Sequence, residues 1–184
     1  QASSAIDRMH AAGVVHRDLK PENLYITRRD DGAPRLKVLD FGIAKVLTDY
    51  PTFTEALEAT KAGPTAFTPR YGAPEQFNKQ RGASGPWTDV FALTLILVEM
   101  ITGRKALDGD DPTQLYIAAA DPTMRPTARA RGACVSDDFE ALSARALALL
   151  PRRLQQLPLA HTAQALLEAL RVQQFPHLDR LLHR

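Results

Sequence analysis

The chain has 184 residues, which is enough for one domain with a hydrophobic core of its own. Hydrophobic residues make up 45% and charged residues 24%, so the composition excludes a disordered, collagen-like or membrane-embedded protein. The formal net charge of +2 is too small to indicate a nucleic acid or an anionic membrane as partner. The single cysteine, Cys134, excludes an internal disulfide and fits a reducing, cytoplasmic compartment.

The first forty residues predict a helix followed by a β-hairpin. Apolar residues recur at helical spacing from Ala2 to Met9, and Gly13 is typical of the position after a helix. Residues 24–27 and 36–39 are short strand-like runs with a charged, turn-rich segment between them. We therefore expect an antiparallel hairpin.

A long irregular segment and a buried helix come next. Residues 48–74 are rich in Thr, Pro, Gly and Ala, and so long a stretch without periodicity is usually functional. Residues 90–102 carry apolar side chains on nearly every face, which predicts a central helix that is buried on most sides. Thr88 or Asp89 is expected to cap this helix, and Gly103 to end it.

The remaining sequence is helical with one basic loop. Asp111 followed by Pro112 predicts a helix to about residue 119, and Asp137 predicts another to about residue 149. A last amphipathic helix is expected at residues 163–172. Between these helices lies a basic loop that is interpreted as solvated rather than as a phosphate site, with Arg125, Arg129 and Arg131. The chain is therefore mainly α, without internal repeats or a second domain.

Three motifs stand in a fixed order. Residues 16–23 read His-Arg-Asp-Leu-Lys-Pro-Glu-Asn, residues 40–42 read Asp-Phe-Gly, and residues 68–75 read Thr-Pro-Arg-Tyr-Gly-Ala-Pro-Glu. With these motifs the chain resembles the C-terminal lobe of a eukaryotic-type serine/threonine protein kinase of bacterial style. The resemblance implies a mainly helical kinase lobe with a small antiparallel hairpin over residues 1–172, followed by a tail at 173–184.

The resemblance also implies the role of each site residue. Asp18 would be the catalytic base, and Lys20 would stabilise the phosphoryl group transferred from ATP. Asn23 and Asp40 would hold Mg²⁺ and, through it, the nucleotide. Lys20 with Thr68 nearby is what serine/threonine-directed members look like, so the expected substrate is a protein serine or threonine.

The hairpin gives an independent reason for the metal site. If Leu24 pairs with Leu39, then Asn23 and Asp40 form the next pair at the open end. An amide and a carboxylate oxygen at that spacing suit Mg²⁺, which prefers oxygen ligands and keeps water and phosphates in its shell. Taken alone, Asp18 and Asn23 are equally typical of turn-forming loop residues, and only the ordered set of motifs favours catalysis.

The resemblance also implies which residues would regulate the site and which would hold its backbone in place. Arg17 would receive a phosphorylated threonine of the loop before the Ala-Pro-Glu anchor, which ends in Glu75. Finding no phosphate in this loop of the active protein would contradict that expectation. Asp89 would either brace the backbone at His16 and Arg17 or only cap its helix. The candidate threonines are Thr48, Thr52, Thr54, Thr60 and Thr65.

The sequence contains neither the Gly-x-Gly-x-x-Gly loop nor the Val-Ala-x-Lys strand of the other kinase lobe. We therefore expect the N-terminal lobe to be absent and these residues alone to be inactive, as one part of an ATP- and Mg²⁺-dependent kinase. The alternatives are a pseudokinase-like regulatory or docking module and a small-molecule phosphotransferase. The expected partners are ATP, a protein substrate and the missing lobe. No nucleic acid and no membrane segment is expected, although a segment outside this chain could tether the parent.

Overall fold

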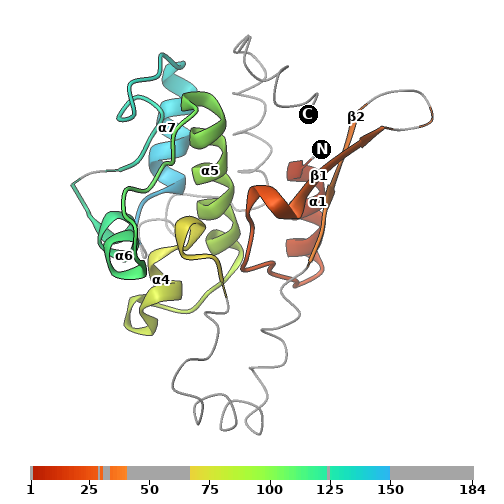
Figure 1. Cartoon of the computed structure of the whole chain (residues 1–184). Helices are drawn as coiled ribbons and strands as arrows, with labels where there is room; N and C mark the ends of the chain where they lie inside the picture. Colours follow the sequence, from red (N-terminus) through yellow and green to blue (C-terminus); the bar gives the residue numbers. More distant parts are fainter. Residues whose placement is uncertain (1, 29, 31–33, 41–66, 124, 150–184) are drawn as a thin grey trace, which may run out of the picture.

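The computed structural model describes residues 2–28, 30, 34–40, 67–123 and 125–149. The structure is mainly helical with one two-stranded antiparallel sheet, as expected, and its longest helix is α5 (Pro86–Thr102). In Figure 1 the first helix and the hairpin lie on one side of α5, and the later helices lie on the other. Among the described residues, no helix has the length and apolarity to cross a membrane. The other elements are α1 (Ala2–Ala11), η1 (Pro21–Asn23), β1 (Leu24–Arg28), β2 (Pro34–Val38), η2 (Pro69–Tyr71), α4 (Pro74–Phe77), η3 (Lys79–Arg81), α6 (Pro112–Ala120) and α7 (Asp137–Ala146).

Helix α5 is the centre of the core, as its apolar sequence predicts. Every residue from Thr88 to Val98 is buried, and the one hydroxyl in the middle, that of Thr94, donates to the Val90 carbonyl at 2.7 Å. The helix ends at Gly103, whose φ of 66° is left-handed. A buried, hydrogen-bonded helix of this kind is a rigid support for whatever its ends hold.

The start of α5 differs from the prediction. The helix begins at Pro86, four residues before residue 90, and its N-cap is Gly85. Proline fits the first helical position because its missing N–H is not needed there. Thr88 therefore lies one turn inside, where its hydroxyl accepts from the Gly85 N–H at 3.1 Å. Asp89 also lies within the first turn and is not the cap, so its carboxylate is available for another role.

The hairpin register also differs from the prediction, by one residue. Leu24 pairs with Val38, not with Leu39, and the Leu39 N–H instead donates to the Asn23 carbonyl at 2.8 Å. Val38 packs partly buried against the core, whereas Leu39 is 40% exposed. Because Val38 and Leu39 are both apolar, the alternation of side chains along the strand does not decide which of them faces the core, and the structure buries Val38. Asp40 therefore lies one position beyond the partner of Asn23.

The ends of the other helices follow the sequence with small shifts. Helix α1 is followed by Gly13 with φ of 74°, and α6 is capped by the Asp111 carboxylate, both as predicted. Helix α7 is capped by Ser136, whose hydroxyl accepts from the Phe139 N–H at 3.3 Å, and it ends at Ala146, three residues before the predicted residue 149. A serine one residue earlier is an equally good cap, and it leaves Asp137 for a different contact.

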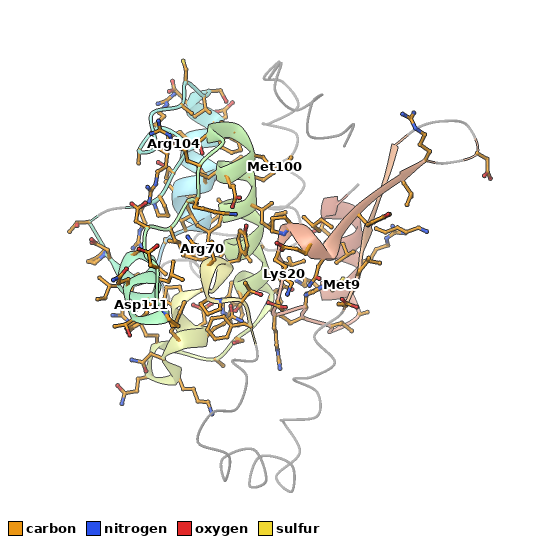
Figure 2. All side chains as sticks on the ribbon, in the orientation of Figure 1. Met9, Lys20, Arg70, Met100, Arg104 and Asp111 are labelled. Carbon is orange, nitrogen blue, oxygen red and sulfur yellow. The ribbon has the colours of Figure 1, made fainter. Side chains whose placement is uncertain are left out.

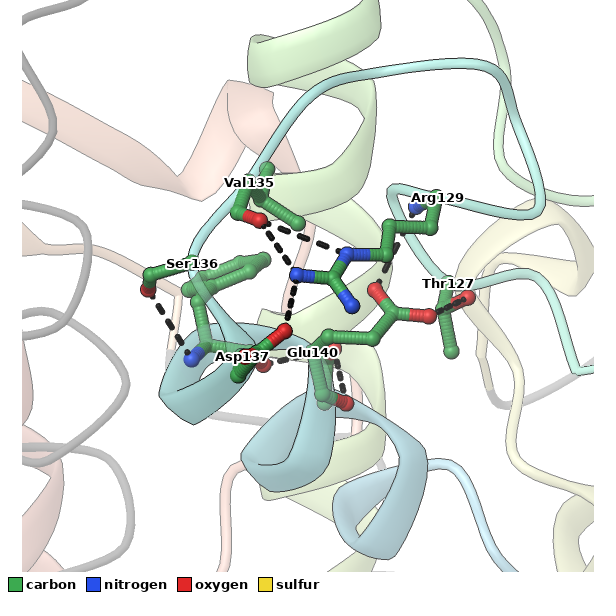
Figure 3. A network of polar contacts seen from close by, with 8 residues as sticks. Thr127, Arg129, Val135, Ser136, Asp137 and Glu140 are labelled. Carbon is green, nitrogen blue, oxygen red and sulfur yellow. Dashed lines mark hydrogen bonds and ion pairs between the residues drawn. The ribbon is translucent and has the colours of Figure 1, made fainter.

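That contact involves the basic loop before α7 (Figure 3). The Arg129 guanidinium donates to the Val135 carbonyl at 2.7 Å and to the Asp137 carboxylate at 2.5 Å. Arg131 Nη1 donates to both carboxylate oxygens of Asp108, at 2.9 and 2.8 Å. These ion pairs brace the loop within the chain, and the Arg129 side chain is still 44% exposed, which agrees with the interpretation as a solvated loop.

Candidate active site

The loop at residues 14–20, between α1 and η1, has no regular secondary structure, and a buried carboxylate holds its backbone. Asp89 of α5 is 1% exposed. Its Oδ2 accepts from the His16 N–H at 2.8 Å and its Oδ1 from the Arg17 N–H at 2.7 Å. Of the two interpretations of Asp89, the brace is confirmed and the helix cap is wrong.

The same carboxylate has a third partner that the sequence analysis missed. His10 Nε2 lies 2.8 Å from Asp89 Oδ2, and only 10% of the His10 side chain is exposed. Its i,i+4 spacing from Ile6, which is fully buried, was the available signal, because residues four apart share one helix face. His10 thus joins α1 to α5.

His16 links this loop to the end of strand β2. Its ring is fully buried, Nδ1 accepts from the Asp18 N–H at 3.3 Å, and Nε2 lies 2.9 Å from the Leu39 carbonyl. An Nδ1 that accepts leaves the proton on Nε2, which therefore donates to Leu39. The His16 ring therefore packs inside the chain and links the loop at residues 14–20 to the end of β2.

Asp18 lies at the centre of a polar cluster with Lys20 and Thr68. Asp18 Oδ1 accepts from the Thr68 N–H at 2.7 Å, and Asp18 Oδ2 lies 3.1 Å from Lys20 Nζ. Lys20 Nζ also donates to the Thr68 hydroxyl at 3.2 Å, which is the proximity expected from the sequence. Figure 2 shows Lys20 where the part with α1 and the hairpin meets the part with α5. About a quarter of each of the Asp18 and Lys20 side chains is exposed, so solvent and a substrate can reach them.

Asn23 and Asp40 are the residues that could hold a metal. The Asn23 amide nitrogen donates to the Asp18 carbonyl at 2.9 Å, which turns the amide oxygen away from that carbonyl. Asp40 is exposed and has a left-handed φ of 51°. One amide and one carboxylate oxygen fit Mg²⁺ with phosphate and water as its other ligands. Among the described residues there is no group of three acidic, histidine or cysteine side chains that could hold a metal without such help.

The segment at residues 68–75 is anchored to α5 through Tyr71, a contact that the sequence analysis also missed. The buried Tyr71 hydroxyl donates to Glu99 Oε2 at 2.8 Å, and Lys105 Nζ bonds both Glu99 and the Tyr71 oxygen. Burial and the adjacent Glu99 carboxylate raise the pKa of Tyr71 to about 12. Glu99 directly after the mainly apolar run at residues 90–98 was the available signal, since such a group needs a partner.

Arg70 and Glu75 fix the same segment at two further points. The Arg70 guanidinium, labelled in Figure 2, donates to the Gly109 carbonyl at 2.9 Å. Glu75 is 3% exposed and its Oε1 accepts from the Thr88 hydroxyl at 2.9 Å. The anchor expected of Glu75 therefore runs, in part, to the first turn of α5.

Phe67 stands where the resemblance implies a glycine, and the structure shows what accommodates it. Its ring meets that of Phe77 edge to face, with 4.9 Å between the centroids. A Cβ at Gly72 would lie 2.4 Å from the Phe67 ring, so no side chain fits at Gly72. The missing side chain at Gly72 therefore leaves the room that the Phe67 ring occupies.

Several predicted residues lie outside the described part of the chain. They are Thr48, Thr52, Thr54, Thr60 and Thr65, the Phe-Gly of the second motif at residues 41–42, the expected helix at 163–172 and the tail at 173–184. The role of Arg17 as receiver of a loop phosphate stays a prediction.

Comparison with known proteins decides the family. The sequence pattern of the protein kinase domain matches residues 1–169. The chain belongs to the protein kinase family. It is 38% identical over 151 residues to the serine/threonine-protein kinase Pkn1 of Myxococcus xanthus, which covers 82% of this chain and 20% of Pkn1. It is 38% identical over 155 residues to pkn3 of the same organism and 36% over 151 residues to PknE of Mycobacterium tuberculosis, covering 82% of this chain and 27% and 24% of those kinases. The chain thus spans about a fifth to a quarter of these relatives.

The stabilisation that Asp89 provides can be compared with that of Asp111, an exposed carboxylate that also accepts from two backbone N–H groups. Asp89→Ala removes the buried acceptor of the His16 and Arg17 N–H groups and should lower the free energy of unfolding by about 2–5 kcal/mol. Asp111 accepts from Thr113 and Gln114 at an exposed helix start, so Asp111→Ala should cost only about 1 kcal/mol. Urea denaturation of both variants measures the difference. Equal losses would show that Asp89 is no more than a second cap.

The raised pKa of Tyr71 predicts how stability changes at high pH. The folded chain keeps the phenol proton up to a pKa of about 12, whereas the unfolded chain loses it near 10. Stability from Tyr71 is therefore complete below pH 10 and falls as the pH rises from about 10 to about 12. In Tyr71→Phe this part of the slope should vanish. Unfolding free energies measured across that range test the prediction, and parallel curves for the two proteins would contradict it.

Proposed function

We propose that this chain is the C-terminal lobe of a serine/threonine protein kinase that transfers the terminal phosphoryl group of ATP to a serine or threonine hydroxyl of a protein. The observation that carries the proposal is the mutual contact of the Asp18 carboxylate, the Lys20 ammonium and Thr68 within 2.7–3.2 Å. The names of the relatives support the same acceptor class. The reaction would take place in the cytoplasm, where ATP is available.

Asp18 supplies the base in this proposal. An incoming hydroxyl donates a hydrogen bond to the carboxylate, which orients the oxygen toward the phosphorus. As the new O–P bond forms, the bond between the terminal phosphorus and the bridging oxygen of ATP breaks, and ADP leaves with that electron pair. The hydroxyl proton passes to Asp18. The backbone N–H of Thr68, 2.7 Å from Oδ1, keeps the carboxylate in one orientation meanwhile.

Lys20, and a Mg²⁺ held by Asn23 and Asp40, offset the negative charge of the phosphates. The Lys20 ammonium, 3.1 Å from the Asp18 carboxylate, places a cation beside the oxygens of the transferring group. Asn23 and Asp40 would hold Mg²⁺, which neutralises phosphate charge when bound. The hydrogen bond from Asn23 to the Asp18 carbonyl ties this metal position to the base.

Substitution of the base tests the proposal in the complete kinase that carries this chain. Asp18→Asn should lower kcat for a serine- or threonine-containing peptide by about 10²–10⁴-fold, because the amide cannot take the proton. Asp138→Asn, an exposed carboxylate of α7, is the matched control and should leave kcat unchanged. Transfer of ³²P from labelled ATP measures both. A wild-type protein that phosphorylates no peptide would favour the docking module, and one that phosphorylates only small alcohols would favour the small-molecule enzyme.

The 184 residues by themselves should transfer no measurable phosphate. The sequence has no Gly-x-Gly-x-x-Gly loop and no Val-Ala-x-Lys strand to cover the nucleotide, so ATP would meet only half of a binding cleft. The purified chain, incubated with labelled ATP, Mg²⁺ and peptide, checks this. Transfer that Asp18→Asn abolishes would show that one lobe is sufficient and would overturn the prediction.

A further inference from the structure

Gln76 of α4 joins two segments that are far apart in the sequence. Its amide nitrogen donates to the Arg17 carbonyl at 2.7 Å, across 59 positions of the chain. Its amide oxygen accepts from the Ala73 N–H at 3.1 Å. A single side chain thus uses its donor on the loop at residues 14–20 and its acceptor on the segment at residues 68–75.

The carbonyl that Gln76 holds belongs to a strained residue. Arg17 has φ of 68°, a left-handed conformation that costs a non-glycine residue energy and persists only where the surroundings fix it. Asp89 binds its N–H and Gln76 binds its carbonyl, so side chains from two different helices fix the two sides of this residue. Without the Gln76 contact, the peptide unit that follows Arg17 loses the 2.7 Å hydrogen bond to its carbonyl and keeps the 3.3 Å bond of its N–H.

That peptide unit leads directly into the base. The Arg17 carbonyl and the Asp18 N–H lie in one planar group, and the N–H donates to His16 Nδ1 at 3.3 Å. Rotation of the group would move the Asp18 Cα and its carboxylate. The other end of the Gln76 amide holds Ala73, in the same segment whose Thr68 N–H binds that carboxylate.

We infer that Gln76 is a positioning residue for Asp18, which acts by fixing the Arg17–Asp18 peptide plane relative to residues 68–75. The inference rests on the proposed function, since it assigns Gln76 to the same phosphoryl transfer. Gln76 does not touch the reacting atoms and works through the base.

The substitution Gln76→Glu removes the hydrogen bond to Arg17 and keeps the one to Ala73. A glutamate keeps an oxygen for the Ala73 N–H but has no donor for the Arg17 carbonyl, and two oxygens then face each other. In the complete kinase, kcat should fall by about tenfold to a hundredfold because the base is misplaced. The KM for peptide should change by less than about twofold, since the contact to residues 68–75 remains. Gln80→Glu, an exposed glutamine of η3 with the same change in charge, should leave both constants unchanged.

A purely structural role for Gln76 predicts a different result. In that case the melting temperature of Gln76→Glu would drop while kcat per folded molecule stayed at the wild-type value, and this outcome would overturn the inference. Gln76→Met, which removes both hydrogen bonds without adding charge, replaces the glutamate variant if that variant does not fold. It should lower kcat and also raise the KM for peptide, and an unchanged kcat would again overturn the inference.

A second readout is independent of catalysis. Hydrogen exchange of the peptide that contains residues 16–20 should be faster in Gln76→Glu than in Gln80→Glu, because the Asp18 amide loses its fixed orientation. If the wild-type kinase transfers no phosphate, the proposed function fails, and exchange still decides the role of Gln76. Faster exchange supports positioning of the loop, and equal exchange in the two variants overturns it.

Discussion

The loop that carries Asp18 depends on one buried carboxylate. Asp89 is nearly inaccessible to solvent, and it binds two consecutive backbone N–H groups and His10 at once. Burying a carboxylate is costly unless its oxygens are hydrogen-bonded, and here each oxygen is. Asp89 belongs to the first turn of α5, which is buried from Thr88 to Val98, and the loop is therefore held by a rigid part of the core. The backbone that carries Asp18 is irregular, but its position is fixed by a helix.

The rest of the loop follows the same rule, with side chains taking the place of the backbone partners that a helix or strand would supply. The carbonyls of Arg17 and Asp18 accept from Gln76 and Asn23, and the Asp18 N–H donates to His16. Buried backbone polar groups must be paired somewhere, and pairing by side chains permits a left-handed residue that regular structure forbids. Gln76 belongs to α4 and Asn23 to η1, while His16 lies in the loop and contacts the Leu39 carbonyl after β2, so a change in any of these places reaches Asp18.

Local signals in the sequence predicted most of the fold, whereas contacts between distant segments were not predictable. The apolar run of α5, Gly103 and Asp111 are effects within one turn of helix, and all three are confirmed. The ordered motifs placed Asp18, Lys20 and Thr68 together because a family pattern already encodes a tertiary contact. The contacts of His10, Gln76 and the Tyr71–Glu99–Lys105 cluster join residues of different elements, and spacing along one sequence can indicate that His10 or Glu99 needs a partner but does not identify that partner.

The wrong hairpin register does not remove the candidate metal position, and the reason lies in where the strands end. In a continuous strand, a slip of one residue moves a side chain to the opposite face, which would separate Asn23 from Asp40. Neither residue belongs to a strand: Asn23 closes the 3₁₀ turn η1, and Asp40 has a left-handed φ two residues after β2. The alternation of side chains between the two faces of the hairpin therefore does not extend to Asn23 or Asp40. The hydrogen bond between Leu39 and Asn23 keeps the two chain segments together at this end, and Asp40 is the next residue along the chain.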